Sequence, residues 1–225
     1  GTGNGSPQNW KIRNPGGGDN LFLASVVALN ADTGEYLWHY QENPNEAWDY
    51  TSTMDMVLDT IEVNGKPRKV LMHAPKNGFF YVIDRETGKL LSTEKVGTQV
   101  SWAKEIDIST GRPVEEPGMR YEEGSVMVSP GAFGAHSWPP MSVNPSTGLV
   151  YIPMIQDAGS YTSDGINISE WLPTPGIWNR SLGWSGIEVP LDKFGSSLLA
   201  WDPVRQQAAW RIPLPGSWNG GTMTT

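Results

Sequence analysis

The sequence predicts an all-β chain built from repeated antiparallel hairpins. Three features support this fold class: glycine and proline are frequent (26 and 18 of 225 residues), tryptophan is unusually common (11), and one strand–turn–strand pattern recurs. Frequent turn residues favour many short strands over long helices. An apolar fraction of 38% is sufficient for a hydrophobic core.

The recurring unit is a strand, a tight turn and a second strand. It appears as VALNADTGEYLWHY (27–40), YVIDRETGKLLST (81–93), MSVNPSTGLVYIP (141–153) and LLAWDPVRQQAAWRIP (198–213). The four turns begin at positions 54, 60 and 58 residues apart, with Asn30, Asp84, Asn144 and Asp202. A fifth, weaker turn lies within 106–114.

Each turn has a simple physical basis. An Asn or Asp side chain accepts hydrogen bonds from backbone N–H groups two or three residues later. Three of the four units then carry Thr-Gly, in which glycine can adopt a positive φ. Apolar residues alternate in the flanking segments, as they do in half-buried strands. Trp38 and Trp210 both lie eight positions after the first residue of their turn.

A repeat of about 40 to 60 residues with several strands per unit is typical of a β-propeller. Four units of three or four strands each would form an arc and not a closed ring. We therefore predict that residues 1–225 are one incomplete propeller domain of about four blade units, with upstream and downstream blades absent. The alternative is a β-sandwich with coincidental turns, which does not explain the regular spacing.

Composition excludes several classes of function. The net charge is −8, from 24 acidic and 16 basic residues, and no basic stripe is present, so we expect no nucleic-acid partner. No run approaches the length of 18 apolar residues, so we expect no membrane span in this piece. Cysteine is absent, which excludes disulfides, thiolate metal sites and cysteine nucleophiles within it.

The motifs together resemble one enzyme family, the PQQ-dependent (quinoprotein) alcohol dehydrogenases of the methanol/ethanol dehydrogenase type, which use pyrroloquinoline quinone (PQQ). The stretch ALNADTGEYLW (28–38) is similar to the family's tryptophan-docking repeat, with Asn30 in place of aspartate. The resemblance covers essentially the whole chain and implies an interior fragment of an eight-bladed propeller. Four motifs follow in the family's order: GTGNGSPQNW, AWDYTS, APKNGFFYVID and HSWPPMSVNPSTGLVYIP.

The resemblance implies a function for the full-length protein. It implies oxidation of a primary alcohol to the aldehyde by hydride transfer to PQQ, in a periplasmic enzyme with a cytochrome c-type electron acceptor. A haem c domain, if present, would lie downstream. The family's glutamate metal ligand, stacking tryptophan and cysteine pair would lie upstream, so the fragment is expected to be inactive by itself.

The first motif, GTGNGSPQNW, is not a dinucleotide-binding loop. No strand precedes it, and Pro7 and PGGGDN (15–20) follow where a helix should begin. We expect a flat turn that presents Asn4, whose amide oxygen is a hard ligand suited to Ca²⁺. The resemblance implies that Asn4 is a calcium ligand. The alternative is that Asn4 only caps a turn.

The second motif contains Asp49 between Trp48 and Tyr50. By resemblance, Asp49 is the catalytic aspartate and also lies at the metal. A nearby Ca²⁺ would keep the carboxylate ionised among aromatic neighbours, and it could then accept the hydroxyl proton of an alcohol as a general base. Trp48 and Tyr50 would exclude water. The alternative is a surface aspartate between two core aromatics.

Three further positions are expected to contact the cofactor. Lys76 precedes the strand FFYVID, and the resemblance places its ammonium group where it can stabilise charge on the quinone oxygens. Ser137 stands where the family often has asparagine, so that contact is weaker. We expect Lys76, Ser137, Trp138 and Trp218 to bind PQQ, with solvated Lys76 as the alternative.

The metal is predicted to be Ca²⁺ because of one neutral residue. Relatives that use a lanthanide carry a second aspartate two positions after the catalytic one, and a trivalent ion needs that extra negative charge. Here the position is Thr51, and Asp55 would have to fold back to replace it. A lanthanide is therefore the less expected metal.

Two other functions were weighed. A non-catalytic propeller scaffold would share the turns but would have no reason to keep Asn4, Asp49 and Lys76 together. A PQQ-dependent sugar dehydrogenase is disfavoured by the Trp-rich segment 155–195, where Trp171, Trp178 and Trp184 are expected to form an apolar funnel for small alcohols. His39, His73 and His136 are too scattered to form a metal cluster and are expected to be structural.

Overall fold

The computed structural model describes every residue except 98, 178, 184–185, 187–189 and 191–193. Its elements, in chain order, are α1 (Trp10–Arg13), β1 (Ser25–Leu29), β2 (Tyr36–Gln41), β3 (Met56–Val63), β4 (Lys66–His73), β5 (Phe79–Asp84), β6 (Leu90–Lys95), β7 (Ala103–Asp107), β8 (Arg112–Glu115), β9 (Ser125–Val128), β10 (Ser142–Asn144), β11 (Leu149–Gln156), β12 (Gly159–Thr162), β13 (Gly195–Asp202) and β14 (Gln207–Leu214).

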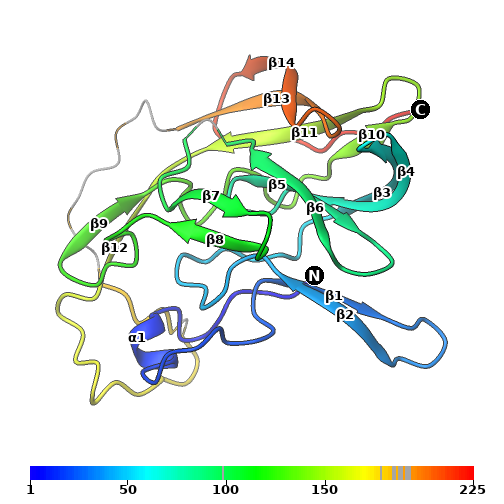
Figure 1. The fold of residues 1–225 in the computed structure, drawn as a ribbon. Coiled ribbons are helices and arrows are strands. Elements are labelled where there is room, and N and C mark those ends of the chain that lie inside the picture. The colour runs from blue at the N-terminus through cyan, green and yellow to red at the C-terminus, as the bar shows by residue number, and fades with distance from the viewer. Residues whose placement is uncertain (98, 178, 184–185, 187–189, 191–193) are drawn as a thin grey trace.

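The strands pair in antiparallel sheets, as expected (Figure 1). Two sheets have four strands, in the orders β3-β4-β5-β6 and β10-β11-β13-β14. Three have only two strands, β1-β2, β7-β8 and β9-β12. The all-β prediction is confirmed. The prediction that every unit has three or four strands is wrong. Before β1, segment 1–24 is rich in glycine and proline, which weaken strand pairing, and it runs mostly as loop.

The turn residues bond as the sequence predicts. The Oδ1 atom of Asp84 accepts the backbone N–H groups of Glu86 and Thr87, both at 3.0 Å. Asn30 and Asp202 accept the same pair of bonds, whereas the Asn144 side chain accepts only the N–H two residues later. Four positions after the first turn residue the chain takes a positive φ, supplied by glycine in three units and by Gln206 (φ 53°) in the fourth. The fourth turn, which lacks Thr-Gly, therefore adopts the same positive φ without a glycine.

Trp38 shows how one repeat docks on the next. A Cβ atom added to Gly88 would lie 2.6 Å from the Trp38 ring, so the indole rests directly on the turn glycine of the following unit. Only glycine allows both this close approach and the φ of 74°. Trp210, at the same place in the fourth unit, contacts Tyr151 and is 39% exposed.

The β3–β6 sheet is covered on both faces. All six residues of β5 are buried. Phe80 and Val82 belong to a core with Ile152 and other residues of the β10–β14 sheet. Tyr81, on the opposite face of β5, belongs to a second core around Trp102. A strand buried on both sides is expected for a sheet stacked between neighbours, as in a propeller.

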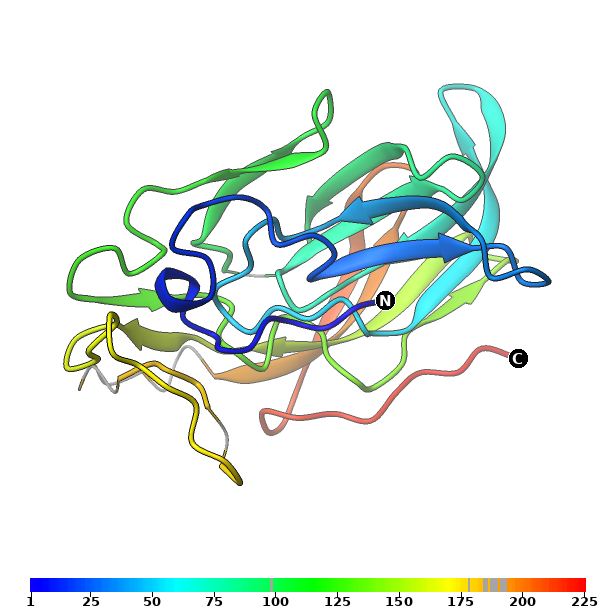
Figure 2. The same cartoon turned by 90° about the horizontal axis from the view of Figure 1, so that it is seen from below.

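The N-terminal segment contacts the long excursion that follows β12. Figure 2 shows α1 beside the yellow segment that follows β12. Asn9 joins them, since its Nδ2 atom donates to Ser163 Oγ at 3.1 Å and to Ser181 O at 3.0 Å. In the part of the chain that the structure describes, no helix is long and apolar enough to cross a membrane.

Candidate functional site

The loop around Asp49 is anchored by its two aromatic neighbours. Trp48 and Tyr50 are buried, at 0% and 1% exposure. The Trp48 indole N–H donates to Met119 O at 2.8 Å, and the Tyr50 hydroxyl donates to Pro130 O at 2.6 Å. Asp49 between them keeps 33% of its side chain exposed. The two aromatic side chains are therefore buried while the carboxylate stays accessible, and the expected role of Trp48 and Tyr50 in excluding water stays a prediction.

Lys76 lies directly against Asp49. Its Nζ atom is 3.6 Å from Asp49 Oδ2 and donates to the backbone oxygen of Asp49 at 3.1 Å. The lysine side chain is only 10% exposed. The alternative of a solvated surface lysine is therefore excluded by its burial.

The electrostatic balance at Asp49 has two opposing parts. Burial raises the pKa of its carboxyl group, because desolvation disfavours the charged form. The positive charges of Lys76 and Arg180 oppose this effect, but the net shift is upward. A bound cation beside Asp49 would shift this pKa back downward, because a positive charge favours the ionised carboxylate.

Asn4 and Asp49 line the same hollow, which has a volume of about 130 Å³ and also contacts Gln8 and Arg180. A neighbouring hollow of about 240 Å³ shares Asp49, Gln8 and Arg180 and extends towards Tyr161. The two segments run side by side here, since Ser52 N donates to Thr2 O at 3.0 Å. The structure thus brings Asn4, Asp49 and Lys76 together, although they are up to 72 residues apart.

Sequence reasoning missed Gln8 and Arg180 as lining residues. Gln8 lies in the first motif, four positions after Asn4, and could have been noted there. Arg180 comes from the long excursion between β12 and β13, and no local pattern marks it. Its position beside Asp49 depends on where that excursion folds back.

The AFGAHSW stretch (132–138) runs alongside Lys76. Ala135 N donates to Lys76 O at 2.9 Å, and a hydrogen bond of 2.6 Å joins His136 Nδ1 to Ala74 O. His136 is buried, and its ring links two loops, in agreement with a structural role. Gly134 packs on the lysine itself, because a Cβ atom there would lie 2.5 Å from Lys76 Cβ and Cγ.

Replacing Gly134 with alanine should displace Lys76. We expect a loss of stability of about 1–3 kcal/mol from overpacking, together with a fall in alcohol oxidation by the full-length protein. Gly118→Ala is the matched control, because Gly118 has a similar φ (80° against 83°) but no atom within 4 Å of its added Cβ. Thermal unfolding and turnover measure the two effects. Equal behaviour of both variants would contradict close packing on Lys76.

Three of the predicted cofactor-binding residues differ in their exposure to solvent. Ser137 is buried, whereas Trp138 and Trp218 are 75% and 44% exposed. The two indole rings meet edge to face with centroids 5.9 Å apart, and Phe133 contacts Trp218 at 5.8 Å. These rings form an exposed aromatic cluster. Their binding to PQQ stays a prediction.

Two other expectations concern the long excursion and the histidines. Trp171 is half-buried, and Trp178 and Trp184 lie outside the described residues, so the apolar funnel stays a prediction. His39 bonds to the Tyr36 hydroxyl at 2.7 Å, and His73 bonds to Glu42 at 2.8 Å.

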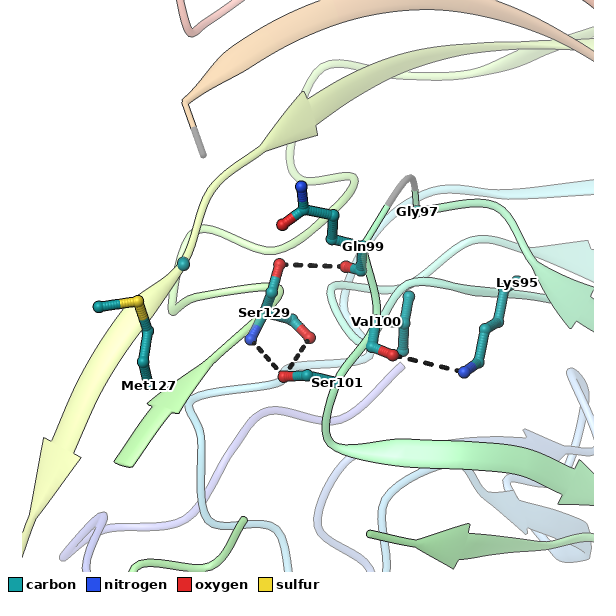
Figure 3. Close-up of a pocket in the computed structure, with 8 residues that line it drawn as sticks. Lys95, Gly97, Gln99, Val100, Ser101, Met127 and Ser129 are labelled. Atoms are coloured by element: carbon teal, nitrogen blue, oxygen red, sulfur yellow. Dashed lines mark hydrogen bonds between the residues drawn. The ribbon is translucent and has the colours of Figure 1, made fainter. Parts of the chain in front are cut away.

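A larger hollow, of about 530 Å³, is lined by Lys95, Val100, Ser129 and neighbouring residues (Figure 3). Two of its polar side chains bond to backbone oxygens: Lys95 Nζ donates to Val100 O at 3.3 Å, and Ser129 Oγ donates to Gln99 O at 3.1 Å. Met127 adds an apolar wall. None of the predicted site residues lines it, so size alone does not mark the candidate site.

Known proteins with similar sequences and structures share one family description. Residues 1–97 match the PQQ family described as glucose/ethanol/alcohol dehydrogenase, beta-propeller domain. The whole chain is 52% identical, over 226 residues, to the quinohemoprotein alcohol dehydrogenase ADH IIB of Pseudomonas putida, of which it covers 32%. The chain is therefore similar over its whole length to a PQQ-dependent alcohol dehydrogenase.

Solved structures of this family share the fold. The quinohemoprotein alcohol dehydrogenase ADHIIG of Pseudomonas putida HK5 superposes with a TM-score of 0.90 and 45% identity, over 99% of this chain and 34% of that chain. A europium-containing methanol dehydrogenase superposes with a TM-score of 0.74 and 28% identity, over 93% and 36%. The prediction of a partial β-propeller is confirmed.

The chain spans about a third of the length of the relatives it matches. The predicted number of blade units within residues 1–225 is not tested by this match and stays a prediction. The same holds for the roles of the individual site residues.

Proposed function

We propose that the full-length protein oxidises a primary alcohol to the aldehyde with PQQ as the hydride acceptor. The observation that supports this function best is the convergence of Asn4, Asp49 and Lys76, which come from three separate motifs and lie close together. A structural scaffold has no need of an accessible carboxylate, a buried ammonium group and an amide oxygen in one place. The relatives named above are alcohol dehydrogenases, which supports the same proposal.

Each residue has a distinct part in this proposal. Asp49 accepts the hydroxyl proton of the alcohol, because its carboxylate is accessible and held in a fixed loop. Lys76 donates hydrogen bonds to the quinone oxygens, where negative charge develops. When bound, PQQ supplies the hydride acceptor and the metal acts as a Lewis acid. Ser137, Trp138 and Trp218 complete the cofactor site in the proposal.

The donor atoms of this chain fit Ca²⁺ but do not complete its shell. Asn4 and Asp49 offer an amide oxygen and a carboxylate beside one hollow, which are ligands that Ca²⁺ prefers. Among the described residues, no group of three or more His, Cys, Asp or Glu side chains is placed to hold a metal ion. Since Ca²⁺ takes about six to eight oxygens, the proposal requires further ligands from the cofactor and from outside these 225 residues.

The electron acceptor in this proposal is a cytochrome c-type haem. The two similar proteins of Pseudomonas putida are quinohemoproteins, which supports a haem partner or domain. A periplasmic location belongs to the same proposal and rests on the family resemblance.

The decisive experiment uses the full-length protein reconstituted with PQQ. We expect oxidation of small primary alcohols that requires both PQQ and Ca²⁺, with an artificial dye as the electron acceptor. Glucose should be a poor substrate by comparison. Absence of PQQ-dependent turnover with any alcohol would support the scaffold, and preference for glucose would support a sugar dehydrogenase.

The choice of metal should depend on position 51. Thr51 is buried beside the Asn4 segment, with its Oγ1 atom 3.7 Å from a Cβ placed on Gly3. Asp55 cannot easily replace an extra ligand, because its carboxylate accepts Met141 N at 3.2 Å and 3.3 Å.

We therefore expect Thr51→Asp to raise the ratio of lanthanide to Ca²⁺ affinity in the full-length protein. The physical reason is the added negative charge beside a trivalent ion. Thr53→Asp is the control, since Thr53 is exposed and only two positions away. Metal titration of both variants gives the ratio. A native enzyme that works only with a lanthanide would refute the assignment of Ca²⁺.

A further inference from the structure

We propose that Arg13 and Glu46 are positioning residues that hold the loop of Asp49 in register with the segment of Asn4. The inference rests on the proposed function above and extends it to residues that lie behind the site. Neither side chain lines the hollow between Asn4 and Asp49. Both act through backbone groups, and no sequence motif marks either of them.

Glu46 brackets Asp49 from both sides. Its Oε1 atom accepts the backbone N–H of Trp48 at 2.6 Å and of Tyr50 at 2.8 Å, so one oxygen holds both neighbours of Asp49. The Glu46 side chain is completely buried. Asp49 itself has a φ of 70°, a left-handed conformation that L-residues seldom adopt. One hydrogen bond to the residue on each side of Asp49 holds the loop in this conformation.

Arg13, in α1, joins the two segments. Its Nη1 atom donates to Pro7 O at 2.8 Å and to Gln8 O at 3.0 Å, which lie shortly after Asn4. Its Nη2 atom donates to the backbone oxygen of Glu46. One planar guanidinium group thus spans the backbone of both the metal-ligand segment and the base loop.

Arg13 also packs against Gly5, the residue next to Asn4. A Cβ atom on Gly5 would lie 2.7 Å from the Cζ and Nε atoms of Arg13, so the glycine backbone packs on the guanidinium. The Nε atom is used as well, because it donates to Asn20 Oδ1 at 2.9 Å. With these donors engaged, Arg13 has little freedom, and a shift of it would move Asn4 relative to Asp49.

The link between the two segments requires an arginine at position 13 and a side-chain oxygen acceptor at position 46. Arginine presents five donors in a rigid fork, whereas lysine is a point charge on a flexible stem. Arg13→Lys should therefore keep the charge but lose the link between segments. In contrast, Glu46→Gln keeps an oxygen acceptor for both N–H groups and should preserve the loop, while Glu46→Ala removes it.

The test uses the full-length protein and two readouts. Ca²⁺ is titrated into the PQQ-reconstituted protein, and amide hydrogen exchange of residues 44–52 is measured in the metal-free protein. Glu46→Ala and Arg13→Met should each weaken Ca²⁺ binding by about 10–100-fold, the usual effect of losing support behind a ligand. Both should speed exchange of the loop. Glu46→Gln should restore wild-type behaviour, and Arg13→Lys should not.

Arg112→Met is the matched control, because Arg112 forms a bidentate pair with Asp19 at 2.7 Å and 2.8 Å on the surface. It should change neither readout. Unchanged exchange and affinity in Glu46→Ala and Arg13→Met would overturn the proposal, as would equal losses in Glu46→Gln and Glu46→Ala. A wild-type protein that binds no Ca²⁺ would refute the proposed function, and the exchange of the metal-free loop would still decide the positioning roles.

Discussion

Asp49→Asn should lower kcat/KM for a primary alcohol by about 10²–10⁴-fold in the full-length protein, the range that a general base contributes. Asparagine has nearly the same shape but cannot accept the hydroxyl proton. The fold should survive, because asparagine is among the residues that best tolerate the positive φ found at Asp49. Steady-state turnover with PQQ and Ca²⁺ present measures the loss, and thermal unfolding checks the fold.

The pH dependence gives this prediction a second signature. A base must be deprotonated, so wild-type activity should fall as the pH drops through the pKa of Asp49. Burial raises that pKa above its ordinary value in the metal-free chain, and a bound cation should lower it. The residual activity of Asp49→Asn should lack this fall, because no carboxyl group titrates there.

Asp107→Asn is the control for this substitution. Asp107 begins the fifth turn, where its Oδ1 accepts Ser109 N at 2.8 Å, and asparagine begins the equivalent turns at Asn30 and Asn144. The control should therefore be fully active. Undiminished turnover in Asp49→Asn would refute the base role.

Lys76→Met should lower kcat by about 10²–10³-fold, the usual cost of removing one donor to a developing negative charge. Methionine has a similar length and retains the packing against Gly134. The substitution also removes a positive charge 3.6 Å from Asp49, so the pKa of Asp49 should rise further. Single-turnover reduction of bound PQQ by alcohol is the measurement.

Lys69→Met is the matched control, since Lys69 is 56% exposed and pairs with Glu86 on the surface at 3.0 Å. It should leave the rate unchanged. Lys76→Arg should keep part of the activity because it keeps a cationic donor. If Lys76→Met reduces PQQ as fast as the wild type, the lysine is only a structural partner of Asp49.

The turns and the family motifs could be predicted because their physics is local. Asp84 caps its turn through N–H groups only two and three residues away, so its role can be read from a short stretch. The glycine four positions later follows from the same geometry. The candidate site was likewise marked by short motifs around Asn4, Asp49 and Lys76.

Tertiary structure alone decided how these motifs are held together. Arg13 reaches the carbonyl of Glu46, 33 residues away, and Arg180 reaches the hollow beside Asp49 from another loop. The sequence predicts the turn of Gly88 and the strand position of Trp38 separately. It does not predict that the two residues contact each other. Such contacts depend on how loops and sheets pack after each has formed, and a single sequence encodes that packing through long-range side-chain fit and not through spacing.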